Sequence, residues 1–132
     1  MADETRLNLL VLRCRSIDAT AAFYAHLGFA FDRHRHGGGP EHLGAERDGW
    51  VFELYPAKDG VADTAGLGFE VADLVAARQR LADAGFAPGD VRTEPWGTVC
   101  VARDPDGRRV ELKHWEGEPT PLPEVIAQVP DP

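Results

Sequence analysis

The feature that most constrains the fold of this chain is an internal repeat. The segment Asp48-Gly49-Trp50-Val51-Phe52-Glu53-Leu54 returns 58 residues later as Asp106-Gly107-Arg108-Arg109-Val110-Glu111-Leu112. Leu27-Gly28-Phe29 and Ser16-Ile17 are echoed 57 residues later by Ala84-Gly85-Phe86 and Asp73-Leu74. Three landmarks at nearly one offset indicate a structural unit that is used twice. A duplicated unit builds a cleft between its copies, so the repeat also shows which cleft positions keep chemically useful side chains.

Both halves predict the same order of strands and one helix. Alternating apolar residues and turn residues predict strands over 7–14, 29–35, 42–47 and 50–55 in the first half, and over 65–71, 91–93, 98–103 and 108–114 in the second. Helices are predicted over 17–26 and 74–84, because Ser16 and Asp73 are good N-caps and Gly28 and Gly85 are good helix stops. The result is an α+β fold of two tandem β-α-β-β-β modules.

The modules are predicted to form a single domain over 1–132. Module one covers about 6–56, a polar linker covers 57–64, module two covers about 65–114, and a proline-rich tail covers 115–132. With 132 residues the chain is long enough for one domain with a real core.

Charge and composition narrow the classes of partner. The net charge of −8 argues against nucleic acid, which would require a basic face. The acidic N-terminus does not fit a signal peptide, and no apolar stretch reaches transmembrane length, so no membrane contact is expected. Cys14 and Cys100 each fall in a predicted strand and have no close spacing. They indicate buried, reduced thiols and therefore a cytoplasmic location.

At this point the sequence resembles the vicinal oxygen chelate superfamily, also called the glyoxalase/bleomycin resistance/dioxygenase superfamily. The residues that carry the resemblance are Ser16…Phe23-Tyr24…Leu27-Gly28-Phe29 and Asp48-Gly49…Glu53-Leu54, then Val71-Ala72-Asp73-Leu74, Gly85-Phe86 and Asp104-Pro105-Asp106-Gly107…Glu111-Leu112. Pro95-Trp96-Gly97 before a strand and Arg103-Asp104-Pro105 is particularly similar to the bleomycin-resistance branch. The resemblance implies a curved mixed sheet around a cleft, and a homodimer.

The same resemblance raises the question of a metal ion. Metal-dependent members place a histidine on the first strand of a module and a glutamate on its last strand, which suits nickel, zinc, manganese or iron. The two glutamates are matched by Glu53 and Glu111, but the histidine positions fall on Leu9 and Gly66. We therefore predict no metal and no other cofactor. If a metal is bound, the expected ligands are Glu53, Glu111 and a displaced histidine, either His42 or His114.

Strand alternation selects the residues that face the predicted cleft. Glu53 shares its strand face with Tyr55, whereas Trp50, Phe52 and Leu54 lie on the other face and are predicted to be core. Glu111 lies between Arg109 and Lys113 on its face, so a salt bridge is the alternative role for it. Trp96 lies in a turn from which it could stack on a flat ligand, with packing against its own module as the alternative. The predicted ligand-binding residues are Glu53, Tyr55, Trp96, Val99, Val101 and Glu111.

Three functions are compatible with these residues. The preferred one is a metal-independent binding protein of the bleomycin-resistance type, which sequesters an aromatic compound that can also be cationic, and is not an enzyme. The alternative is a metal-dependent lyase, isomerase or dioxygenase that uses Glu53 and Glu111. A third is a degenerate member that is kept for protein–protein contact. No catalytic residue is assigned.

Overall fold

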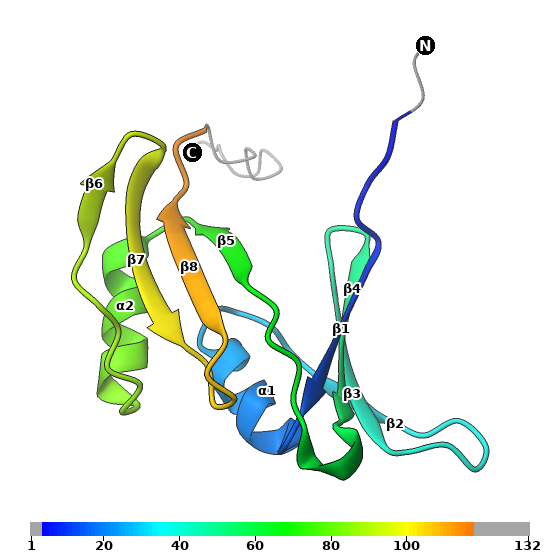
Figure 1. Ribbon diagram of the computed structural model, residues 1–132. Coiled ribbons are helices and arrows are strands. Elements are labelled where there is room, and N and C mark those ends of the chain that lie inside the picture. Colours follow the sequence, from blue (N-terminus) through cyan, green and yellow to red (C-terminus); the bar gives the residue numbers. More distant parts are fainter. Residues whose placement is uncertain (1–3, 118–132) are drawn as a thin grey trace, which may run out of the picture.

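The computed structural model describes residues 4–117 as two modules with the same order of elements (Figure 1). Module one consists of β1 (Leu9–Cys14), α1 (Ile17–Ala25), β2 (Asp32–His34), β3 (His42–Arg47) and β4 (Trp50–Pro56). Module two consists of β5 (Leu67–Val71), α2 (Leu74–Asp83), β6 (Arg92–Glu94), β7 (Gly97–Arg103) and β8 (Arg109–His114). A short 3₁₀ helix, η1 (Lys58–Gly60), lies in the linker. The predicted α+β fold with two β-α-β-β-β modules is confirmed.

Each module forms a four-stranded mixed sheet. Sheet A has the strand order β1-β4-β3-β2, and sheet B has the equivalent order β5-β8-β7-β6. β1 runs parallel to β4 and β5 runs parallel to β8, while the other neighbours are antiparallel. The arrangement follows from the position of the helix, because a helical crossover is what allows the first strand to pair in parallel with a later one.

Both helices begin where the sequence predicts. The Ser16 hydroxyl accepts a hydrogen bond from the Ala19 N–H at 3.1 Å, and the Asp73 carboxylate accepts one from the Ala76 N–H at 3.0 Å. The strand predicted over 29–35 is shorter in the structure and is limited to β2. The reason is Phe29, which is buried between the sheets, with its ring centroid 5.2 Å from that of Phe52, instead of lying in the sheet.

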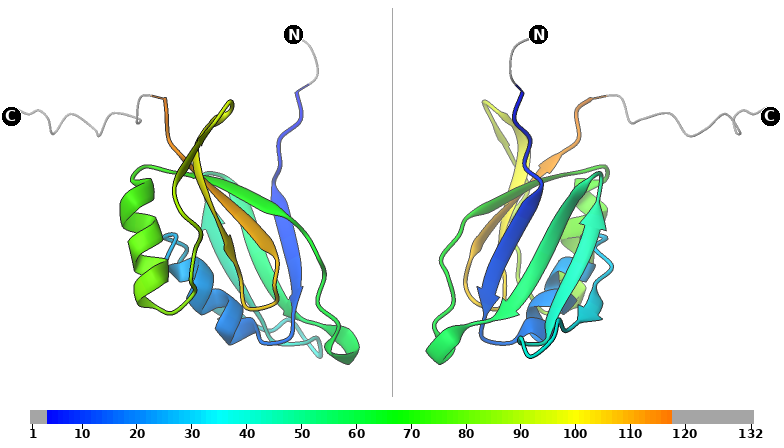
Figure 2. Two further views of the ribbon diagram at one scale, coloured as in Figure 1. Left: turned by 60° about the vertical axis from the view of Figure 1, so that its left-hand side comes forward. Right: turned by 90° about the vertical axis from the view of Figure 1, so that its right-hand side faces the viewer.

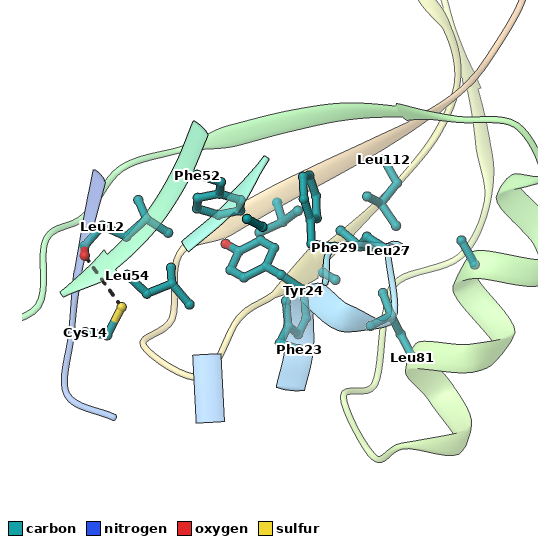
Figure 3. Packing of buried hydrophobic residues seen from close by; sticks show 14 of the residues in the cluster. Leu12, Cys14, Phe23, Tyr24, Leu27, Phe29, Phe52, Leu54, Leu81 and Leu112 are labelled. Atoms are coloured by element: carbon teal, nitrogen blue, oxygen red, sulfur yellow. Dashed lines mark hydrogen bonds between the residues drawn. The ribbon is translucent and has the colours of Figure 1, made fainter. Parts of the chain in front are cut away.

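One core holds the two modules together. Tyr24 from α1 packs edge-on against Phe52 of sheet A, with the ring centroids 5.0 Å apart (Figure 3). The Tyr24 ring centroid also lies 6.1 Å from that of Phe69 of sheet B. Phe23 contacts Phe86 of module two at 5.0 Å. The sheets therefore face each other through a shared apolar and aromatic cluster, with α1 against β3 and β4 and α2 against β7 and β8. We call the face of each sheet that turns away from this core its outer face. Figure 2 (right) looks onto that of sheet A, with the helices behind it.

A buried arginine ties the linker to both modules. The Arg108 side chain is fully buried and donates to both carboxylate oxygens of Asp63, at 2.8 and 3.0 Å. It also donates to Asp104 at 2.9 Å, to Asp106 at 3.2 Å and to the Arg13 carbonyl at 2.6 Å. We call these five residues the Arg108 clasp. It joins the end of β1, the linker and the β7–β8 turn, so it fixes how the modules are placed relative to each other.

The clasp shifts the ionisation of its members. Burial alone would lower the pKa of Arg108, but hydrogen bonds from its guanidinium to Asp63 and Asp104 raise that pKa above its ordinary value. Burial alone would raise the pKa of Asp63, but hydrogen bonds from Arg108 and from the backbone N–H groups of Arg13 and Ala65 lower it to about 2. Burial and the hydrogen bond from its hydroxyl to Asp104 raise the pKa of Tyr24. Arg108 is thus held protonated and Asp63 ionised near neutral pH.

Two further expectations from the sequence concern the C-terminal tail and the absence of membrane-spanning segments. Most of the tail predicted over 115–132 lies outside the described residues. Within residues 4–117, neither helix has the length and apolar character needed to cross a membrane.

Candidate functional site

The outer face of sheet A presents Glu53 and Tyr55, as alternation predicts. Both are half-buried, while Phe52 and Leu54 between them are fully buried in the core. Glu53 pairs across the sheet with Val11 on β1 and with Gly44 on β3. Over this row lies a hollow of about 350 Å³, which is lined by residues of β2, β3, β4 and the loop after β2. Glu53 therefore faces a real depression in the molecular surface.

The ring of Tyr55 is covered on both sides by its strand neighbours. His42 on β3 stacks on it with a centroid separation of 4.3 Å and an interplanar angle of 7°. From β1 on the other side, the Arg13 guanidinium lies 4.9 Å from the ring centroid. A ligand can thus reach the edge and hydroxyl of Tyr55 but has no free ring face on which to stack.

The outer face of sheet B presents Trp96 and Glu111. Trp96 occupies the tight turn between β6 and β7, where Glu94 pairs with Gly97, and it is 53% exposed. Its indole N–H donates to a carboxylate oxygen of Glu111 at 3.3 Å. The indole is therefore exposed to solvent and at the same time held in one orientation. Trp96 thus contacts its own module through Glu111 while about half of its surface stays exposed.

The remaining predicted residues of sheet B differ in accessibility. Val99 is fully buried, and Val101 is half-buried opposite Glu111 on β8. Of the two valines, only Val101 has surface that a ligand could reach. The alternative role of Glu111 as a salt-bridged residue finds no support among the described residues, because Lys113 instead approaches Glu70 at 3.8 Å.

The six predicted ligand-binding residues fall into two separate groups. Glu53 and Tyr55 lie on the outer face of sheet A, and the other four belong to the outer-face side of sheet B. Because the core-facing sides of the sheets pack against each other, the two outer faces turn away from each other. The hollow over sheet A is lined by module one alone. One chain does not bring Glu53 and Glu111 into one cleft.

Similarity to known proteins identifies the family of this chain. The model of the glyoxalase/bleomycin resistance protein/dioxygenase superfamily matches residues 6–112. The chain belongs to this superfamily. No curated protein matches it.

Several solved structures share the superfamily fold with the chain. TnmS3, an antibiotic-binding protein from Streptomyces sp. CB03234, superposes with a TM-score of 0.70 at 18% identity, over 86% of this chain and 98% of that one. The bleomycin resistance determinant encoded on transposon Tn5 superposes with a TM-score of 0.62 at 22% identity, over 86% of this chain and 100% of that one. A lactoylglutathione lyase from Agrobacterium tumefaciens superposes with 0.64 at 17% identity, over 88% and 100%. At such identities the similarity establishes the fold alone, and the fold is common to binding proteins and to an enzyme.

At two of the positions where the resemblance places metal ligands, the chain has no donor side chain. Leu9 is an aliphatic side chain on the outer face of sheet A, paired with Val51, and Gly66 has no side chain. Glu53 and Glu111, which match the glutamate positions, lie on outer faces that turn away from each other. Among residues 4–117, no three His, Cys, Asp or Glu side chains are placed so that they could share one ion. His42 is 2% exposed, and its Nδ1 lies 3.3 Å from the Pro40 carbonyl oxygen.

Several residues of the outer face of sheet A were not selected from the sequence. Asp32, Gly44 and Glu46 share this face with Glu53, and His34 and His36 line the same hollow. The alternation of β2 and β3 contained the signal, since it places every second residue on one face, but the pairing of the two strands was needed to align the rows.

Proposed function

We propose that this chain is a metal-independent small-molecule binding protein of the bleomycin-resistance type, which sequesters an aromatic compound that can also be cationic. The observation that carries the proposal is Trp96, an exposed indole that Glu111 holds at 3.3 Å on an outer face. A rigid, exposed aromatic ring loses little conformational entropy when a planar ligand stacks on it. The superfamily fold shared with TnmS3, whose name describes an antibiotic-binding protein, supports the same class of function.

We base the proposed metal independence on the side chains that stand at the metal-ligand positions. Histidines are the nitrogen ligands of metal-dependent members, and their positions hold Leu9 and Gly66 in this chain. Burial of an aromatic ligand needs apolar surface and a few placed polar groups, which Val101, Trp96 and Glu111 supply on sheet B. No bond has to be broken, so no catalytic residue is assigned.

We further propose that the chain acts as a homodimer in the cytoplasm. A second copy could place its sheet B opposite sheet A, which would bring Glu53 of one copy to the same cleft as Trp96 of the other. β1 is an edge strand of sheet A, and β5 is an edge strand of sheet B. At the β1 edge, Leu7 and Leu9 are 65% and 47% exposed. Burial of that apolar surface would favour pairing. The cytoplasmic location rests on Cys14 and Cys100, both of which are free and buried.

The test measures ligand binding by isothermal titration calorimetry, with acridone as a planar neutral probe. We expect saturable binding that is unchanged by EDTA and about tenfold weaker in Trp96→Ala, because aromatic stacking contributes about 1–3 kcal/mol. Val75→Ala is the matched control, since Val75 is an exposed apolar residue on α2, away from both outer faces. Its affinity should equal that of the wild type. Sedimentation equilibrium on the same samples should give twice the mass of the chain.

The competing functions give different results. A metal-dependent enzyme would lose its binding or turnover in EDTA and in Glu53→Gln. A member kept only for protein–protein contact would show no saturable binding of planar aromatic compounds and no effect of Trp96→Ala. Either pattern would overturn the proposal.

A further inference from the structure

The apolar core opens to solvent between the two sheets. A groove of about 380 Å³ lies between the edge strands β1 and β5. Within residues 4–117 it is lined by two glycines and by five larger apolar residues, with no acidic or basic side chain: Leu7, Leu10, Trp50, Leu67 and Phe69. We call it the inter-sheet groove. Concave apolar surface of this kind marks a place where another segment or molecule binds.

The groove is continuous with the core. Trp50 of sheet A and Phe69 of sheet B line it, and their ring centroids lie 5.8 and 5.5 Å from that of Phe29. Phe29 is buried, whereas Trp50 and Phe69 are only partly buried, and Leu7 beside them is 65% exposed. An apolar segment in the groove would therefore complete the burial of both rings, and it would cover the unpaired edges of β1 and β5.

The described part of the chain ends near this groove. β8 is the neighbour of β5, and the Trp115 N–H donates to the Val71 carbonyl at 2.7 Å, beside the end of β5 (Figure 1). The groove residue Leu67 lies about 13 Å back along β5 from Val71, and the crossing of one strand adds about 5 Å sideways. The chain from Gly117 to Leu122 spans up to about 17 Å when extended. Leu122 can therefore reach the groove.

Residues 118–132 lie outside the described residues, but their sequence contains an apolar stripe. Four apolar residues have the spacing i, i+3, i+4 and i+7 that is typical of one face of a helix: Leu122, Val125, Ile126 and Val129. Pro123 suits the first turn of such a helix, and Pro130 directly follows the stripe. The sequence therefore predicts a short amphipathic helix over 122–129, and amphipathic helices bind apolar grooves through their apolar face.

We propose that residues 122–129 bind in the inter-sheet groove of their own chain, with the apolar stripe against Leu7, Trp50 and Phe69. The segment joins module one to module two across the open side of the core. It also protects the edges of β1 and β5 from pairing with strands of other molecules. This docking does not depend on the proposed ligand site, because neither Trp96 nor Glu111 lines the groove.

The test attaches a nitroxide spin label to the full-length chain and measures which backbone amide signals it broadens in the NMR spectrum. Ala127→Cys provides the attachment site, since position 127 lies opposite the stripe on the predicted helix. A maleimide nitroxide should react there alone, because Cys14 and Cys100 are buried. We expect loss of the amide signals of Leu67 and Phe69, and their return when the nitroxide is reduced.

Two matched pairs of variants add the same charge on and off the proposed contact. In the segment, Ile126→Glu interrupts the apolar stripe, whereas Gln128→Glu lies outside it. In the groove, Leu7→Glu places a carboxylate at an exposed lining position, whereas Val61→Glu changes a linker residue that is 72% exposed and does not line the groove. The lost signals should return in Ile126→Glu and Leu7→Glu only. Circular dichroism of each variant verifies that the fold is retained.

A mixed sample identifies the chain whose segment is bound. It contains isotope-labelled chain without the nitroxide, together with nitroxide-labelled chain that is invisible in the spectrum. Signal loss at Leu67 and Phe69 in this mixture would show that the segment of a second copy fills the groove, and would overturn the proposal. Unchanged signals in the singly labelled sample, or a loss that persists in Ile126→Glu, would also overturn it. Loss within one chain alone, abolished by Ile126→Glu and by Leu7→Glu, supports it.

Discussion

Replacement of Arg108 by alanine should be the most damaging single change outside the apolar core. The substitution leaves the Asp104 carboxylate, which is 0% exposed, without its counter-charge. The Asp106 carboxylate, which is 2% exposed, loses one of two arginine partners and keeps the ion pair with Arg15 at 2.9 Å. The Asp63 carboxylate is 30% exposed and can regain water. Removal of one partner from a buried ion pair costs about 3–5 kcal/mol.

The loss is large relative to the stability of a domain. Since a domain is typically stable by about 5–15 kcal/mol, we expect the melting temperature to fall by roughly 10–20 °C. Urea unfolding followed by circular dichroism measures the free energy of unfolding directly. The matched control is Arg103→Ala, because Arg103 is exposed and makes one long hydrogen bond, 3.3 Å to the Gly107 carbonyl. It should change stability by less than about 0.5 kcal/mol.

A second variant keeps the argument testable if Arg108→Ala does not fold. Arg108→Lys retains the charge but cannot contact both oxygens of Asp63 and also Asp104, so we expect a loss of about 1–3 kcal/mol. A loss below about 1 kcal/mol in Arg108→Ala would refute the reasoning. It would mean that the carboxylates become hydrated by a small rearrangement and that the clasp contributes little.

The other predictions concern protonation, hydrogen bonding and thiol access. Because the pKa of Asp63 is lowered to about 2, below its value near 4 in the unfolded chain, its contribution of about 2 kcal/mol is present above pH 4 and lost as the pH falls to 2. In Asp63→Asn this part of the acid dependence of urea unfolding should vanish; an unchanged profile would contradict the assignment. Tyr24→Phe removes the donor to buried Asp104 and should cost about 1–2 kcal/mol by the same assay, whereas no loss would show that water replaces the hydroxyl. Burial raises the pKa of the Cys14 and Cys100 thiols, so a disulfide reagent such as DTNB should label them only in denaturant, and rapid labelling of folded protein would disprove their burial.

Much of the fold could be predicted from local patterns. The helix caps at Ser16 and Asp73 and the alternation around Phe52 and Glu53 depend on neighbouring residues, and the structure has them as expected. The exception is Phe29, whose apolar character suggested a strand but which fills the space between the sheets. Propensity could not distinguish these roles, because the partner Phe69 is distant in sequence.

The sequence by itself determined that one module is used twice and which face of each strand is polar, because the period of a strand and the capping of a helix are local properties. Only the tertiary structure decided how the faces are combined. The core-facing sides of both sheets are apolar and bury each other through Tyr24 and Phe69, so Glu53 and Trp96 end on outer faces that turn apart. The clasp between Arg108 and Asp63, which are 45 residues apart, and the hollow that three strands of sheet A line arise in the same way. Such contacts depend on the packing of distant segments, which no local pattern records.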